Sequence, residues 1–145
     1  MRKDRSNCPL TCALDIIGDK WSLIIIRDIF LGKKTFTEFL KSKERIATNI
    51  LTNRLDLLIS NNLLKVTKMP NDQKTKIYYL TDAGIDMYPI IYEMMQWSDK
   101  NVIKNFGSIW TNDLKGSIDQ SPKAAILNTT ESYRSSRKEI LAYHI

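Results

Sequence analysis

Apolar residues recur at helical spacing near the start of the chain and predict two helices there. The first begins at Cys8-Pro9, because proline is favoured at the first position of a helix, and it ends at Gly18. Asp19 can cap the second, which runs from Lys20 to Leu31. That helix is apolar nearly all round, as expected of a central helix.

Polar residues mark the next two predicted helices. Thr35, with Glu38 three residues later, forms a capping-box pattern that begins a short third helix. The fourth helix, Ala47 to Asn61, divides into an apolar and a polar face when its residues are placed about 100° apart. The polar face carries amides, hydroxyls and one carboxylate, on Thr48, Asn49, Thr52, Asn53 and Asp56. Lysine and glutamate, usual on solvated faces, are absent, so we interpret it as a recognition surface, an ordinary solvated face being the alternative.

A hairpin and a long helix are predicted next. Leu64 to Met69 and Lys76 to Leu80 form two short strands around the turn-forming cluster Pro70-Asn71-Asp72-Gln73. A helix is expected from Thr81-Asp82 to about Ile103, with a kink at Pro89. Further on, Ser121-Pro122 predicts one or two weak helices in the tail.

This order of elements predicts the fold class. Three helices, a polar-faced fourth and a basic hairpin match an α+β, mostly helical fold. It is a winged helix-turn-helix domain with a two-stranded β-wing and a long C-terminal dimerisation helix. We expect the domain to span residues 8–104, and residues 105–145 to form a C-terminal extension that is helical in part.

The net charge of +6 is concentrated in one part of the chain. Ten basic and four acidic residues lie between Lys33 and Lys76, so this segment holds the whole excess. Such localisation indicates an anionic partner, the alternative being a solvated basic face without one.

Several other classes of protein are disfavoured. Two cysteines and one histidine cannot form an ordinary four-ligand zinc site, so no metal or other cofactor is expected. No nucleophile with a base, paired carboxylates or phosphate-binding glycine loop indicates an enzyme, and no catalytic residue is assigned. No apolar run approaches the length that spans a membrane, and no secretory signal is visible, so we expect a cytoplasmic protein.

Double-stranded DNA is the anionic partner that fits this arrangement. Asparagine and threonine side chains pair with base edges in the major groove, and lysines neutralise phosphates. An RNA partner is a weaker interpretation, because no aromatic stacking platform interrupts the basic segment. A protein-interaction module is the main alternative, and a salt titration separates it from DNA binding. The candidate DNA-binding residues are Lys34, Thr35, Thr48, Asn49, Thr52, Asn53, Lys68, Lys74 and Lys76.

Six short motifs are spread over the first hundred residues: the opening Cys-Pro, Gly18-x-Lys-Trp21, Phe36-Thr-Glu-Phe39, Leu51-Thr-x-Arg54-Leu55, Tyr79-x-Leu-Thr81-x-x-Gly84 and Trp97. Together they resemble the HxlR-type winged helix regulators of the MarR-like superfamily. The resemblance runs from about Cys8 to Asn101, and Ser60-Asn61-Asn62 departs from the family's usual acidic residue and glycine. It implies dimers, palindromic operators, and repression or activation of nearby genes.

A homodimer is also expected from the residues themselves. The predicted helix from Asp82 to Ile103 has more apolar surface than one short domain can cover, and large exposed patches usually mark interfaces. The first helix, Cys8 to Ile17, should pack beside it.

Cys8 is a candidate redox-sensing residue. At the N-cap of the first helix, with Arg2, Lys3 and Arg5 nearby, its thiolate should be stabilised, whereas Cys12 is expected to be an inert filler. The resemblance implies a signal, since several HxlR-type proteins with a cysteine at this position sense oxidants, quinones or aldehydes. A small electrophile or oxidant is therefore a possible partner, and a packed structural thiol is the alternative.

Arg54 falls on the inward side of the fourth helix. We expect it to form an internal ion pair with Glu38 or Asp28, because a buried arginine without a partner is very costly. A phosphate contact is the functional alternative.

Overall fold

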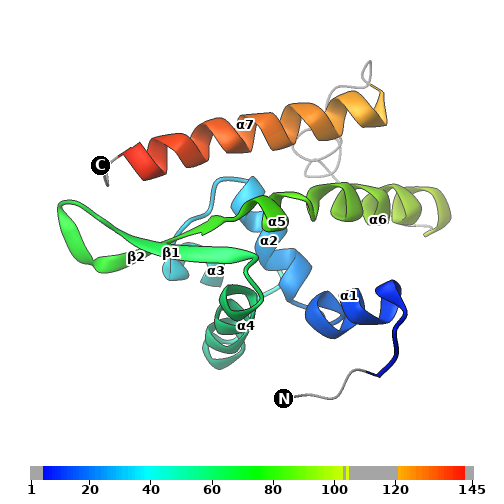
Figure 1. Cartoon of the computed structure of the whole chain (residues 1–145), viewed down its shortest axis with the longest axis horizontal. Helices are drawn as coiled ribbons and strands as arrows, with labels where there is room; N and C mark the ends of the chain where they lie inside the picture. Colours follow the sequence, from blue (N-terminus) through cyan, green and yellow to red (C-terminus); the bar gives the residue numbers. More distant parts are fainter. Residues whose placement is uncertain (1–4, 103, 105–120, 143–145) are drawn as a thin grey trace.

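The computed structural model describes residues 5–102, 104 and 121–142 (Figure 1). Its antiparallel hairpin forms a two-stranded sheet, and the fold is the mostly helical α+β winged helix-turn-helix predicted from the sequence. In chain order the elements are α1 (Pro9–Ile17), α2 (Ser22–Phe30), α3 (Phe36–Leu40), α4 (Thr48–Ser60), β1 (Leu64–Met69), β2 (Asp72–Leu80), α5 (Asp82–Ile85), α6 (Tyr88–Asn101) and α7 (Pro122–Ala142).

The helix starts follow the predicted caps, with one shift. Thr35 accepts a hydrogen bond from the Glu38 amide at 3.3 Å and begins α3. The Asp19 carboxylate accepts from the Trp21 and Ser22 amides at 2.7 and 2.9 Å. Because Asp19 holds these two amides, α2 begins at Ser22 rather than at Lys20.

The long helix predicted from Thr81 to Ile103 is two helices in the structure. It is interrupted at Asp86 and Met87, where the Met87 amide turns back to the Gly84 carbonyl at 3.1 Å. Pro89 lies in the first turn of α6, where its missing N–H costs nothing. The proline therefore begins a second helix, and the expected kink is a complete break.

The hydrophobic core lies between α2, α3, α4, α5 and the base of the hairpin. Ile26 of α2, Leu51 of α4 and Leu80 of β2 are fully buried. The apolar face of α4 supplies three leucines to this core, as the sequence pattern predicted. The core therefore fixes which face of α4 points outward.

The C-terminal helix α7 is longer than the weak helix expected in the tail. It lies along α6 and across the base of the hairpin (Figure 1). Ser121 caps it as predicted, accepting from the Ala124 amide at 3.2 Å. Tyr133 of α7 packs against Phe30 with ring centroids 5.2 Å apart, and Phe30 also packs against Tyr88 of α6 at 4.8 Å. These aromatic contacts fasten α7 to the domain.

Gly84 of α5 provides a test of the close packing between α5 and the backbone of Leu63. A Cβ at this position would lie 2.2 Å from the Leu63 carbonyl oxygen, a backbone atom that cannot rotate away. Gly84→Ala should therefore lower the free energy of unfolding by about 1–3 kcal/mol or more, measured by chemical denaturation. Ala83→Ser, at an exposed neighbouring position, is the control and should change stability little. Equal stability of Gly84→Ala and the wild type would contradict this packing.

Candidate nucleic-acid interface

The polar face of α4 is solvent-exposed, as predicted. Thr48, Asn49, Thr52, Asn53 and Asp56 are all exposed, while the leucines on the opposite face are buried. The Thr52 hydroxyl donates to the Thr48 carbonyl at 3.0 Å. The side-chain amides of Asn49 and Asn53 form no hydrogen bond with other described residues, so both remain available to a ligand.

The hairpin brings two of the predicted lysines directly opposite each other. Lys68 of β1 pairs with Lys76 of β2 in the strand register, so their side chains lie on the same face. Tyr78 shares that face by strand alternation, and its ring contacts Phe39 of α3 with centroids 6.0 Å apart. The lysine-bearing face is therefore the one turned toward α3 and α4.

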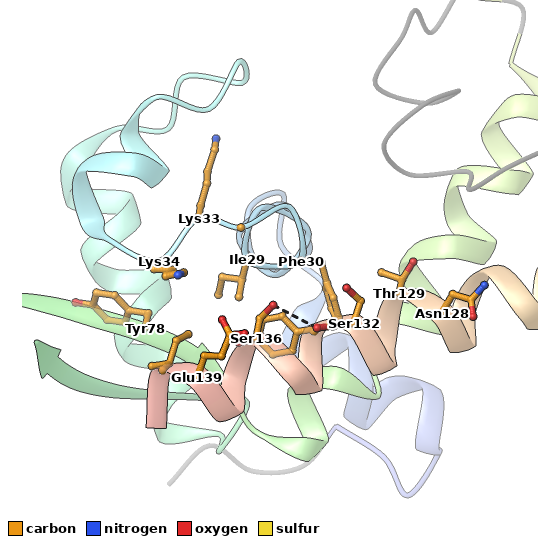
Figure 2. Close-up of a pocket in the computed structure, with 13 residues that line it drawn as sticks. Ile29, Phe30, Lys33, Lys34, Tyr78, Asn128, Thr129, Ser132, Ser136 and Glu139 are labelled. Carbon is orange, nitrogen blue, oxygen red and sulfur yellow. Dashed lines mark hydrogen bonds between the residues drawn. The ribbon is translucent and has the colours of Figure 1, made fainter. Parts of the chain in front are cut away.

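A groove connects the hairpin with the helix-turn-helix. Its volume is about 400 Å³, and its walls come from the start of α3, from α4 and from β2. Thr35, Thr52, Lys74 and Lys76 line it, so the structure brings together predicted residues from three elements. Lys34 does not line this groove. It lies beside a second cavity of about 580 Å³, between α7 and the segment that follows α2 (Figure 2).

One acidic side chain also lines the groove. Asp56 is an exposed residue of α4, and its negative charge adds to the effect of burial in raising the pKa of Tyr78. A carboxylate here weakens attraction for phosphate locally, and it narrows the region of positive potential to the hairpin side of the groove.

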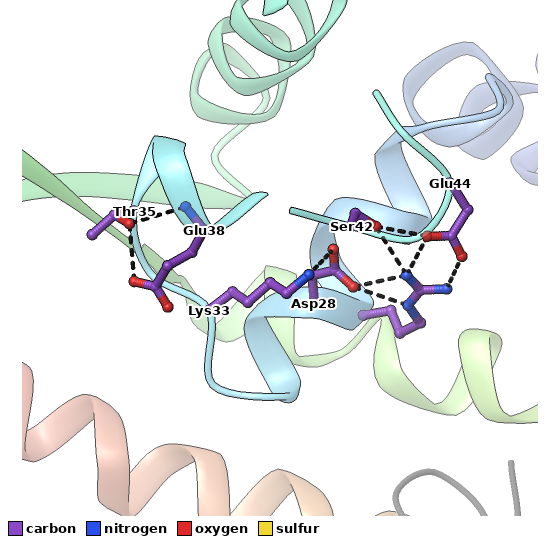
Figure 3. Close-up of polar contacts among 7 residues, drawn as sticks. Asp28, Lys33, Thr35, Glu38, Ser42 and Glu44 are labelled. Carbon is purple, nitrogen blue, oxygen red and sulfur yellow. Dashed lines mark hydrogen bonds and ion pairs between the residues drawn. The ribbon is translucent and has the colours of Figure 1, made fainter. Parts of the chain in front are cut away.

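An ionic network holds the turn between α3 and α4 (Figure 3). Arg27 of α2 pairs with Glu44 at 2.6 Å and with the buried Asp28 at 2.8 Å. The Ser42 hydroxyl also donates to Glu44 at 2.6 Å. The pKa of Glu44 is lowered to about 2, mainly by the hydrogen bonds that its carboxylate accepts from Arg27. The turn that leads into α4 is therefore fastened to the central helix.

Sequence reasoning did not identify this network. Its signal was present, because Arg27 and Asp28 interrupt a run of isoleucine and leucine where an uncompensated charge would be costly. The turn also holds Arg45 in a left-handed conformation with φ of 56°. Its side chain is exposed, just before α4, which adds a basic residue beside the polar face.

Arg54 forms an ion pair, but the predicted partners were wrong. Its guanidinium lies 3.4 Å from Asp19, in the segment before α2. Glu38 instead accepts from the Thr35 hydroxyl at 2.9 Å, and Asp28 is paired with Arg27 and Lys33. The inward side of α4 at Arg54 thus faces the start of α2, which periodicity alone does not reveal.

Cys8 lies exposed at the N-cap of α1. Hydrogen bonds from the backbone of Thr11, and next of Leu10, lower the pKa of its thiol. Arg5 is paired with Asp15 at 2.6 Å, while Arg2 and Lys3 lie outside the described residues.

Cys12 is also exposed, so it does not fill an apolar contact among the described residues as expected, and its lower reactivity stays a prediction. Its Sγ lies 3.9 Å from the Ser6 carbonyl oxygen. The side of α1 that carries Cys12 is open to solvent, whereas Ile17 is the residue that α1 buries.

Apolar side chains are exposed on α1 and α6, at the end of the molecule away from the hairpin (Figure 1). On α6 they are Ile90, Met94 and Trp97, spaced to form one stripe. On α1, Leu10 and Leu14 are the most exposed. These two surfaces are those expected to form a dimer contact.

The described residues, 5–102, 104 and 121–142, contain neither a metal site nor a membrane span. In these ranges no three histidine, cysteine or acidic residues are grouped so that they could hold a metal ion. Among the helices that the structure describes, none is long and apolar enough to span a bilayer.

Sequence comparisons connect this chain with known regulators. The HxlR-like helix-turn-helix family model matches residues 16–106, well over half of the chain. Rv3095 of Mycobacterium tuberculosis, an HTH-type transcriptional regulator, is 32% identical over 88 residues, which are 61% of this chain and 55% of that protein. The match thus spans little more than half of that relative. YdeP of Bacillus subtilis, another HTH-type transcriptional regulator, is 33% identical over 67% of this chain and 76% of that protein.

Solved structures show the same likeness. PA1607, a transcription factor by its description, superposes with a TM-score of 0.65 and 33% identity, covering 72% of each chain. The reduced form of the regulator YodB from B. subtilis superposes with a TM-score of 0.57 and 27% identity, covering 68% of this chain and 97% of that one. YodB has also been solved diamide-treated and quinone-bound. The redox regulator HypR in its oxidized form superposes with a TM-score of 0.56 and 31% identity, covering 65% of this chain and 97% of that one.

The exposed polar helix, the lysine-bearing hairpin and the match over residues 16–106 lead to one conclusion. This chain belongs to the HxlR-like helix-turn-helix family, whose members are transcriptional regulators and not enzymes.

Proposed function

We propose that this protein binds specific DNA sequences as a homodimer on palindromic operators and so represses or activates transcription. The groove between α4 and the hairpin carries the proposal, because Thr52 of the exposed polar face of α4 lines it together with Lys74 and Lys76 of β2. In this role Asn49 and Asn53 contact base edges in the major groove, and the hairpin lysines contact phosphates.

The opposed lysines of the hairpin support an anionic partner. Like charges directly across two strands repel each other, so Lys68 and Lys76 weaken the isolated hairpin. A phosphate between them removes that repulsion and adds two favourable pairings. The contact is electrostatic, and it therefore predicts a steep dependence of DNA affinity on salt concentration.

The two sets of residues should respond differently to substitution. Asn49→Ala or Asn53→Ala should reduce the preference for the operator over random DNA by about 1–3 kcal/mol per lost base contact. Lys68→Ala, Lys74→Ala or Lys76→Ala should weaken binding to every sequence alike and reduce the salt slope by about one unit. Fluorescence anisotropy with both DNAs across a salt series measures the two effects.

The comparison of Asn49→Ala with Lys76→Ala is the decisive control for this assignment. If the two variants give the same pattern, α4 is not the recognition helix. A shallow salt slope in the wild type would favour the protein-interaction module instead.

The proposed dimer uses the exposed stripe of α6 together with α1. Trp97 is 64% exposed and Leu10 is 65% exposed, values that leave large apolar areas in contact with water. A two-fold axis at this end leaves both hairpins free at the other end. The two recognition helices would then reach half-sites about 10 base pairs, or a multiple of that, apart.

A charge in the stripe should therefore disrupt the dimer. Trp97→Glu places a carboxylate in the proposed contact and should convert a dimer into a monomer at micromolar concentration, measured by sedimentation. Leu57→Glu is the control, because Leu57 is exposed to 39% but lies on α4, and this variant should remain dimeric. A monomeric wild type would rule out the homodimer.

Cys8 is the proposed point at which a thiol-reactive signal acts. The quinone-bound form of YodB makes a quinone a suitable probe for this chain. The Cys8 thiolate would add to a ring carbon, forming a carbon–sulfur bond. That carbon then loses its proton, and the two quinone oxygens gain this proton and one from solvent, so that the ring is reduced to a hydroquinone thioether. Exposure of Cys8 and the lowered pKa of its thiol support this reaction.

Substitution of each cysteine tests this role. Treatment with a benzoquinone should change the operator affinity of the wild type, Cys8→Ser should abolish the response, and Cys12→Ser should retain it. Because Cys12 is also exposed, mass spectrometry of the modified peptides should be run with the binding assay. A response that survives in Cys8→Ser would assign the signal elsewhere, and no response in the wild type would leave Cys8 a structural thiol.

A further inference from the structure

The helix α7 contacts the hairpin from a part of the chain that the family model does not match. It lies outside residues 16–106, yet it makes three polar contacts where β2 ends. The Leu80 amide donates to the Tyr133 hydroxyl oxygen at 2.8 Å. Arg137 donates to the Leu80 carbonyl at 3.1 Å and to the Asp82 carboxylate at 2.7 Å. Both backbone polar groups of Leu80 are thus satisfied by α7.

These contacts matter because Leu80 has no access to water. It is fully buried, and Tyr133 is only 7% exposed. Backbone groups at the outer edge of a strand need partners, and a buried group without one is costly. Elsewhere on this edge, the Tyr78 amide donates to the Lys34 carbonyl at 2.8 Å. The outer edge of β2 is therefore held by two segments, of which α7 is the one nearest to α5.

α7 supports the hairpin on the face opposite its lysines. By strand alternation, Thr75 and Ile77 belong to the other face from Lys76, and Met69 follows the register irregularity after Lys68. These three residues and Ile140 of α7 line a cleft of about 420 Å³. The contact is thus tight at Leu80 and looser toward the tip, as for a hairpin fixed at its base.

We propose that α7 is an intramolecular clamp, in which Tyr133 and Arg137 are positioning residues that set the direction of the hairpin and so place its lysines on DNA. This inference rests on the proposed function for its effect on DNA binding. Neither residue contacts DNA in this scheme. Both act through Leu80, so their effect on affinity requires the hairpin lysines.

Hydrogen exchange tests the clamp without DNA. Tyr133→Phe keeps the ring and removes the hydroxyl, and Arg137→Gln removes contacts of a partly exposed side chain with little cost to the core. Each should accelerate exchange across residues 64–80 while α2 stays protected. Tyr88→Phe is the control for the first, since the Tyr88 hydroxyl bonds Thr129 of α7 away from the hairpin. Arg134→Gln is the control for the second, because Arg134 pairs with Glu131 on α7 itself.

DNA binding tests the consequence of the clamp. Tyr133→Phe and Arg137→Gln should each weaken binding about 2- to 10-fold, the range for one lost hydrogen bond, and lower the salt slope. In a Lys68→Ala, Lys74→Ala, Lys76→Ala background the same substitutions should have almost no further effect. The two control variants should leave both quantities near the wild-type values.

The outcomes separate this inference from the proposed function. Additive effects in the background that lacks Lys68, Lys74 and Lys76, or an unchanged salt slope, would overturn the positioning role. Unchanged exchange over residues 64–80 in both Tyr133→Phe and Arg137→Gln would overturn the clamp, whatever the DNA result. A wild-type chain without salt-dependent DNA binding would instead overturn the proposed function, and with it the effect of the clamp on DNA.

Discussion

The placement of α4 depends on a single buried carboxylate. Asp28 is 2% exposed in the central helix α2, and it is stabilised by Arg27 and Lys33. Removing such a charge from water is expensive, and the cost is met only when cations hold it in good geometry. Arg27 reaches Glu44 with the same guanidinium, so compensation of the buried charge also fixes the turn before α4.

The sequence predicted those features that depend on local periodicity. The two faces of α4 follow from the helical periodicity of its apolar and polar residues, because burial imposes that pattern. Both strands of the hairpin were also predicted, although β2 begins at Asp72, within the predicted turn, rather than at Lys76. The exposed polar face of α4 was therefore predicted correctly, including the exposure of Asn49 and Asn53. The caps at Thr35 and Ser121 were also predictable, since capping is a short-range hydrogen bond.

The features that were missed depend on contacts between distant segments. Arg54 pairs with Asp19, 35 positions earlier, and no spacing rule selects that carboxylate over Glu38 or Asp28. Cys12 is exposed because none of the described elements covers its side of α1. The length of α7 depends on burial of Tyr133 against the domain, and its own sequence has only a weak amphipathic pattern. Tertiary packing decided each of these cases.

The aromatic contacts of Phe30 have a mechanical consequence. Phe30 touches Tyr88 of α6 on one side and Tyr133 of α7 on the other, and Tyr88 lies next to Tyr92. Close-packed rings transmit a displacement to their neighbours because they cannot be compressed. Rotation of α6 about its own axis is therefore coupled, ring by ring, to the strand end that Tyr133 holds. A rotation of α6, at one end of the molecule, therefore changes the tilt of the hairpin at the other end.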